Sequence, residues 1–200
     1  MVSRINYALI LLISITLPYP LLAHGYASKI KFSDCDCRWD KSELIVWMDN
    51  EVEFKYTKIA MDAIDAWENN FDKLSYKIYT LPPDEYDIRI TIHKMYGNAV
   101  GLPKETIAFT TNEKGGNDEL IHAAIDLSVY YRNAYGSISS VSDEVFYNMV
   151  LHEFGHAIGL GHAVDNGNEP VDPMHHSLLI NEDRRQVSKL DVLALESLYK

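Results

Sequence analysis

The residues best suited to chemistry in this chain are two histidines and a glutamate with the spacing H-E-x-x-H. His152, Glu153 and His156 lie in a segment whose apolar spacing predicts a helix over residues 141–158. At 3.6 residues per turn the two histidines lie one above the other on the same face, where two neutral imidazoles can reach one zinc ion. Glu153 lies about one hundred degrees round the helix, so it can reach a zinc-bound water more easily than the metal itself.

A third histidine follows where the predicted helix should end. Gly159 tolerates the left-handed backbone that often terminates a helix, Gly161 loosens the chain again, and His162 comes next. A turn at Gly159 would bring His162 back to the same metal. Three histidines with an open fourth position are typical of a catalytic zinc site, whereas structural sites are closed by four protein ligands. Five fixed residues at these offsets should arise by chance in about 1 in 10⁴ chains.

The alternative is that these side chains are structural. A single histidine on a core element is usually a hydrogen-bonded core residue, which is the interpretation that we give to His93 and His122. A metal-free core around His152, Glu153 and His156 would bury an acid and two imidazoles, which is costly unless they are paired or ligated. The sequence therefore predicts a zinc site with an acid beside it.

Hydrophobic spacing predicts the elements that must hold this site. Alternating or short apolar runs predict strands, and apolar residues three and four apart predict helices. Strands are predicted over residues 43–49, 75–81, 87–93, 106–111 and 121–128, with a loop over 112–118. Helices are predicted over 54–71, 141–158 and 188–199, and the last begins with the capping-box pair Ser188 and Asp191. This order of elements favours an α+β domain in which helices cover a mixed sheet.

The composition excludes several classes of protein. The chain has 200 residues, of which 47% are hydrophobic and 24% charged, so it is not collagen-like, coiled-coil or disordered. Its length suits one domain, which we expect to be a monomer. A formal net charge of −11 repels phosphate backbones, so nucleic acid is not expected as a partner. Two cysteines are too few for a disulfide scaffold.

The first 27 residues have the pattern of a secretory signal. An apolar run over residues 7–17 is followed by two prolines and by the small residues Ala23 and Ala27. We predict a signal peptide over residues 1–27, whose removal leaves a secreted domain with no stable insertion in a membrane. The alternative is an uncleaved anchor over residues 5–22, but its polar residues and prolines make a poor spanning helix.

The segment HEFGHAIGLGH, from His152 to His162, resembles the long zinc signature of the metzincin endopeptidases. Further matches are to the matrixin, or matrix-metalloprotease-like, family. They are Trp39-Asp40-Lys41, the AIDAW of residues 63–67, the DIRI of 87–90 and the closing segment 188–199. In pieces they cover residues 39–200, our predicted catalytic domain, which a short segment over 28–38 precedes. The resemblance implies an α+β metzincin-like fold, with a twisted mixed sheet, two long helices and a C-terminal helix.

This resemblance implies a secreted zinc-dependent endopeptidase that acts on extended peptide or protein substrates. One catalytic Zn²⁺ would be held by His152, His156 and His162, and Glu153 would accept a proton from the zinc-activated water. The strand over 106–111 resembles the edge strand on which such enzymes lay a peptide. The alternatives are a non-proteolytic zinc-binding surface module and a non-peptide zinc hydrolase. Glu153 argues against the first, because a protein that only binds metal needs no base.

The family also implies a methionine in a tight turn beneath the histidines, and Met174 is the candidate. Other family features are missing. Of the histidines expected for a second, structural zinc only His122 could match, so we predict no structural zinc. A Ca²⁺ ion could bind near Asn117, Asp118 and Glu119, although a solvated acidic loop is the favoured interpretation.

Two further features of the sequence are left open. Cys35 and Cys37 precede the predicted domain, and either could bind the catalytic zinc to keep the enzyme latent, or they could form a disulfide. His176 lies two residues beyond Met174, where the related astacins and serralysins have a tyrosine that can reach the zinc or the developing oxyanion. His176 could take that role, or it could be an exposed loop residue.

Overall fold

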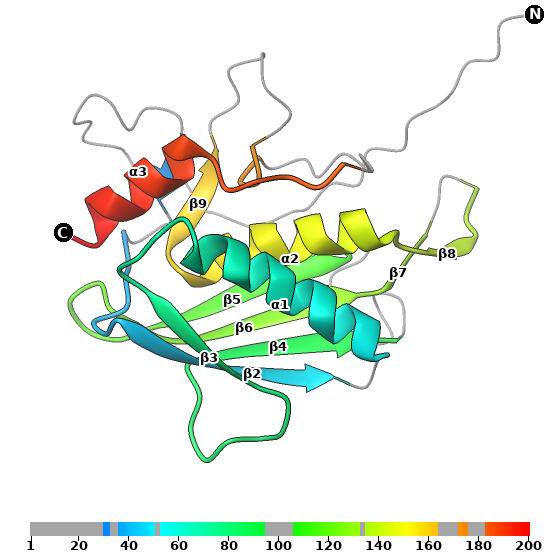
Figure 1. Ribbon diagram of the computed structural model, residues 1–200, viewed down its shortest axis with the longest axis horizontal. Coiled ribbons are helices and arrows are strands. Elements are labelled where there is room, and N and C mark those ends of the chain that lie inside the picture. The colour runs from blue at the N-terminus through cyan, green and yellow to red at the C-terminus, as the bar shows by residue number, and fades with distance from the viewer. Residues whose placement is uncertain are drawn as a thin grey trace, which may run out of the picture.

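The computed structural model describes most of the chain and gives an α+β domain. A mixed sheet of five strands is covered on one face by two long helices, and a third helix lies at the C-terminus (Figure 1). This is the architecture that the order of elements predicts. The described residues are 30–32, 36–50, 53–94, 106–132, 135–163, 172–175 and 183–200.

The sheet combines parallel strands with one antiparallel edge strand. Its strands are β2 (Glu43–Asn50), β3 (Ser75–Tyr79), β4 (Ile88–His93), β5 (Ala108–Lys114) and β6 (Leu120–Ser128). The order across the sheet is β3-β2-β4-β6-β5, in which β5 runs antiparallel to β6 and all other neighbours are parallel. Strand β5 therefore forms one edge of the sheet.

Strand β4 shows why the sheet has one buried face. Ile88, Ile90 and Ile92 are almost completely buried, whereas the side chains between them are only half-buried. Successive side chains point to opposite faces of a sheet, so the three isoleucines pack under the helices. The alternation in the sequence predicts this arrangement, and the structure confirms it.

Helices α1 (Phe54–Glu68) and α2 (Asp143–Ala157) pack against each other above the sheet (Figure 1). Trp67 of α1 is fully buried, and its Nε1–H donates to Leu151 O of α2 at 2.9 Å. The side-chain oxygen of Ser142 caps α2, because it accepts a backbone N–H of the first turn at 3.2 Å. These contacts fix the helix that carries the H-E-x-x-H residues.

The helix predicted over residues 54–71 ends earlier, at Glu68. Two asparagines follow, and asparagine favours turns because its side chain competes for backbone hydrogen bonds. Phe71 is nevertheless buried, with its ring centroid 5.5 Å from that of Tyr199. Phe71 fits the apolar spacing because it belongs to the core, although it does not belong to the helix.

The C-terminal helix α3 (Lys189–Leu198) begins at the predicted capping box. Asp191 N donates to Ser188 Oγ at 3.1 Å, and Ser188 N donates to Asp191 Oδ2 at 2.9 Å. Two backbone groups that the helix itself leaves unpaired are thereby satisfied. The start of this helix was therefore predictable from two residues.

The turn between β5 and β6 is shorter than the predicted loop over residues 112–118. Strand β5 continues to Lys114, and the chain reverses where Gly115 N donates to Glu119 O at 2.9 Å. Asn117 and Asp118 adopt positive φ values of 62° and 57°. Asparagine and aspartate tolerate this backbone. The residue types of the turn therefore predicted where the chain reverses, but not where the two strands end and begin.

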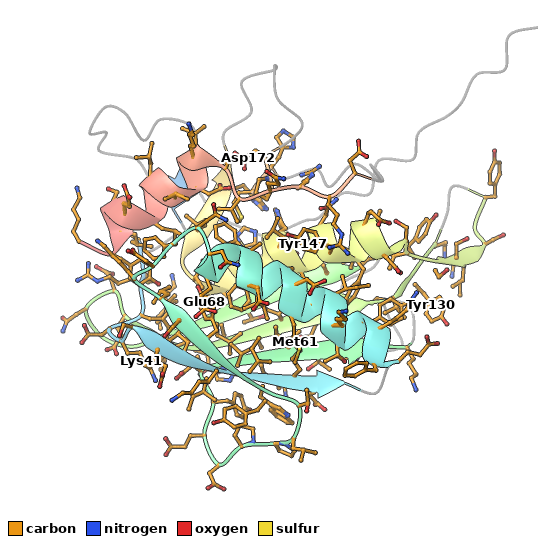
Figure 2. The ribbon with its side chains drawn as sticks, in the orientation of Figure 1. Lys41, Met61, Glu68, Tyr130, Tyr147 and Asp172 are labelled. Carbon is orange, nitrogen blue, oxygen red and sulfur yellow. The ribbon has the colours of Figure 1, made fainter. Side chains whose placement is uncertain are left out.

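Four short strands were not predicted. Strand β1 (Ile30–Phe32) pairs antiparallel with β9 (Leu160–Ala163), and β7 (Tyr130–Arg132) pairs with β8 (Ile138–Ser140). Strands of three or four residues contain too few side chains for a periodic pattern to be recognised. The β7–β8 hairpin extends beyond the start of α2 (Figure 1), and Tyr130 is labelled on it in Figure 2.

Candidate metal centre

The three histidines of the zinc pattern converge on one point. His152 and His156 lie in the last turns of α2, and His162 lies on β9. The Nε2 atom of His156 is 3.1 Å from Nε2 of His152 and 3.3 Å from Nε2 of His162. Zinc–nitrogen bonds of 2.0–2.1 Å in a tetrahedral site separate two nitrogens by about 3.3 Å, so the three imidazoles fit one zinc ion. Within the described ranges, no other group of three His, Cys, Asp or Glu side chains lies close enough to share a metal.

The hydrogen bonds of the two helix histidines leave Nε2 free to bind a metal. His152 Nδ1–H donates to Pro173 O at 2.6 Å, and His156 Nδ1–H donates to Leu160 O at 2.8 Å. A carbonyl can only accept, so in each neutral ring the proton is on Nδ1 and the lone pair is on Nε2. Burial lowers the pKa of both histidines, and the neighbouring imidazoles add to the effect at His152. Both rings are therefore held in the neutral form that coordinates a metal.

The turn that brings His162 back requires a glycine. Gly159 has φ +103°, and a Cβ added there would lie 2.5 Å from Cys37 O and 2.7 Å from Leu198 Cδ2. Gly159 N donates to His156 O at 3.0 Å, which closes the end of α2. The predicted turn is confirmed, and the backbone carbonyl of Cys37 adds a steric reason for glycine that the sequence alone does not reveal.

Met174 packs directly beneath the turn of α2 that carries His152 and His156. It is fully buried, and its Sδ lies so close to Gly155 that a Cβ on that glycine would collide with it. Ala163 N donates to Met174 O at 2.7 Å, so the same turn also holds β9. Because His152 is hydrogen-bonded to Pro173 O, the segment of Pro173 and Met174 supports both elements that supply histidines.

Glu153 is buried beside the histidines, with 3% of its surface exposed. Its carboxylate Oε2 accepts a hydrogen bond from Thr110 Oγ1 at 2.6 Å. Burial raises the pKa of Glu153 to about 7, and the hydrogen bond from Thr110 opposes this shift. The carboxylate is therefore in an environment that would let it take up and release a proton near neutral pH.

The sequence analysis missed two residues of β5 whose side chains donate hydrogen bonds to α2. Thr110 lies in the predicted strand and Asn112 in the predicted loop, and neither was given a role. Asn112 Nδ2 donates to His156 O at 2.9 Å. The only available signal was their spacing of two, which places both side chains on the same face of a strand.

A partly buried polar network ties the turn before Met174 to helix α3. Asp172 (labelled in Figure 2) accepts from Met174 N at 2.8 Å and from Ser188 Oγ at 3.1 Å. Arg185 Nη1 donates to Asp172 O at 2.9 Å. Asp191 is fully buried nearby, and burial, followed by the charge of Asp172, raises its pKa to about 7. The network therefore links the segment of Pro173 and Met174, which contacts α2 and β9, to the C-terminal helix.

The other candidate residues lie away from the three histidines. His93 Nε2 is 2.8 Å from Asp126 Oδ1, and the ring of His122 packs edge-on against Tyr86. Both histidines are half-buried, so they make structural contacts but are not the core residues that were predicted. Cys37 is buried and disulfide-bonded, and therefore has no thiolate to offer a metal. Cys35 and His176, as well as the signal segment, lie outside the described residues.

Comparison with known proteins agrees with this geometry. The family model described as Matrixin matches residues 18–200, which is most of the chain. Comparison with individually curated proteins gives no match. Matrixins are zinc metalloproteases, and the five-stranded mixed sheet with its three helices is consistent with the metzincin fold. The chain therefore belongs to the matrixin family.

Proposed function

We propose that this protein is a secreted zinc-dependent endopeptidase in which Glu153 is the general base. The observation that carries the proposal is the convergence of three Nε2 atoms, at 3.1 and 3.3 Å, beside a buried carboxylate on the same helix. His152, His156 and His162 would hold the zinc. When bound, zinc lowers the pKa of water and polarises a carbonyl.

The remaining chemistry is assigned to residues of the chain. Because Oε2 of Glu153 accepts the hydrogen bond from Thr110, Oε1 is the oxygen that would receive the proton of the attacking water. The same oxygen would then give this proton to the leaving amine as the carbon–nitrogen bond breaks. Burial raises the pKa of this carboxyl, which makes it a stronger base than an exposed glutamate.

Strand β5 supports a peptide as the substrate. It is an edge strand, and it is linked to α2 by hydrogen bonds from Thr110 and Asn112. An extended peptide can add to such an edge through main-chain hydrogen bonds, which places its backbone along the helix of the ligands. Peptide and protein substrates are also what the matrixin family acts on.

Secretion is part of the same proposal. The signal pattern over residues 1–27 and the extracellular location typical of matrixins support it. In the described part of the chain, no helix combines the length and apolar composition that a membrane crossing requires.

The test is hydrolysis of an unfolded protein by the purified chain, with and without a metal chelator, beside Glu153→Gln. We expect chelation to abolish cleavage and added zinc to restore it. Glu153→Gln should keep its zinc and lose about 10²- to 10⁴-fold in turnover, because it lacks the base. A zinc-loaded protein that cleaves no peptide would favour the binding module or the non-peptide hydrolase. Near-normal turnover in Glu153→Gln would contradict the assigned base.

A further inference from the structure

The edge strand β5 sends two neighbouring side chains of one face onto the helix of the zinc ligands. Thr110 Oγ1 lies 2.6 Å from Glu153 Oε2 and 3.0 Å from Glu153 O. Asn112 Nδ2 donates to His156 O at 2.9 Å. These hydrogen bonds attach β5 to α2 at two residues. Thr110 contacts Glu153, which carries the carboxylate, and Asn112 contacts His156, the second histidine of the pair. The position of Thr110 relative to α2 is therefore fixed by two hydrogen bonds, one from Thr110 itself and one from Asn112 on the same strand.

We propose that Thr110 is a positioning residue that orients the Glu153 carboxylate for proton transfer. This rests on the proposed function, in which Glu153 is the base. In the part of the chain that the structure describes, Thr110 is the only side chain that donates to this carboxylate. A hydroxyl that donates to a buried carboxylate at 2.6 Å makes a charge-assisted hydrogen bond, which is stronger than one between neutral groups.

The hydrogen bond distinguishes the two carboxylate oxygens. Oε2 accepts the proton of Thr110, which restrains the rotation of the carboxylate and leaves Oε1 to receive the proton of the water. A base must lie within hydrogen-bonding reach of the proton that it takes, and small errors in orientation reduce the rate. Without the hydroxyl, the carboxylate could rotate, and fewer encounters with the water would be productive.

The backbone of β5 makes the orientation rigid. Thr110 is paired with Ile125 in the antiparallel ladder of β5 and β6, and β6 in turn pairs with β4. The hydroxyl is thus presented from the sheet, whereas the carboxylate comes from the helix. The same strand that we propose to bind the substrate therefore also sets the direction of the base.

The experiment compares the kinetics of Thr110→Val with those of Thr110→Ser in the zinc-loaded protein. Valine has the shape of threonine without the hydroxyl, so kcat should fall about 10-fold while KM changes less than about twofold. Serine keeps the hydroxyl and should retain kcat within about twofold. Thr91→Val removes a threonine hydroxyl from β4, on the sheet face away from the helices, and should leave kcat unchanged.

A second arm uses the Glu153→Gln background. If Thr110 acts through the carboxylate, Thr110→Val should cause little further loss there, because the group that it orients is absent. A further 10-fold loss in that background would overturn the proposal. So would an unchanged kcat in Thr110→Val, or a failure of serine to restore it.

Zinc content and melting temperature of each variant separate positioning from folding. If Thr110→Val lowers the zinc content or the melting temperature, the turnover of Thr110→Ala is compared with that of Thr110→Ser. Alanine and serine differ only by the hydroxyl, so this pair also isolates its effect. Normal turnover of Thr110→Val beside an inactive Glu153→Gln would contradict only the role of Thr110. Normal turnover of Glu153→Gln would instead contradict the proposed function itself.

Discussion

The two histidines that α2 contributes to the proposed zinc site are held by hydrogen bonds to backbone carbonyls. Pro173 O and Leu160 O accept the Nδ1 protons of His152 and His156, and both carbonyls belong to segments that follow α2 in the chain. Partners of this kind fix the tautomer and the ring direction, and their loss commonly reduces metal affinity. The quality of the metal site therefore depends on how accurately these later segments are folded.

His156→Ala should lose both zinc and activity. His156 is central in the cluster, because its Nε2 lies next to those of both other histidines. Two remaining imidazoles cannot complete the three-ligand site of a catalytic zinc. Metal analysis of the purified variant, beside about one equivalent in the parent protein, measures this directly. A His156→Ala variant that retained its zinc would exclude the three-histidine assignment.

At the scale of elements, the features that could be predicted are those that depend on residues close together in the sequence. The alternation of β4, the placement of His152 and His156 on one face of α2 and the capping box of α3 are local features, and the sequence was sufficient for them. Strand β9 and the contacts of Thr110 and Asn112 were missed, because each depends on a partner that is remote in the sequence. Local patterns thus predicted the histidines that converge in the structure, whereas the hydrogen bonds of Thr110 and Asn112 to α2 could be found only from tertiary contacts.

Gly159→Ala should destabilise the protein more than Gly136→Ala. Both glycines have positive φ, of 103° and 81°, which costs alanine about 1–2 kcal/mol. At Gly136 the new methyl group would meet nothing within 4 Å, whereas at Gly159 it would collide with Cys37 O. Overpacking of this kind adds about 1–3 kcal/mol. Denaturant unfolding of both variants gives the difference, and equal losses would show that the collision is relieved.

Asp191 should make the free energy of unfolding of the protein decrease as the pH rises. Its pKa is raised to about 7 in the folded protein, against 3.8 for an ordinary aspartate, with burial as the main cause. Between these values the folded protein keeps a proton that the unfolded chain loses. The contribution of Asp191 to the free energy of unfolding is therefore complete below about pH 4. As the pH rises from there to about pH 7, the free energy of unfolding falls by up to about 1.4 kcal/mol per pH unit.

Asp191→Asn tests this effect, because asparagine cannot ionise. Urea unfolding of the parent and the variant at pH 5.5 and pH 7.5 should show a smaller loss of stability in the variant. Asparagine can still accept the hydrogen bond from Ser188 N, so the capping of α3 is preserved. Equal losses in the two proteins would place the titrating group elsewhere.

At the scale of the whole molecule, we expect the mature protein to begin between Ala23 and Lys29. The apolar run over residues 7–17 and the two prolines that follow it are typical of a cleaved signal. Mass spectrometry of the secreted protein identifies the first residue. Recovery of a chain that still begins with Met1 would favour the membrane-anchor alternative.

Within the part of the chain that the structure describes, β5 has a neighbouring strand on one side only, and its other edge affects how copies of this protein behave toward one another. An unpaired strand edge offers its backbone to any extended chain, including the same edge of a second molecule, and it is therefore a route to aggregation. Glu113 and Lys114 place charges at the exposed end of the strand, and the formal net charge of −11 makes whole molecules repel each other. An edge that is open to substrates thus remains compatible with a dispersed protein, because electrostatic repulsion limits the approach of large, equally charged copies much more than that of a short peptide.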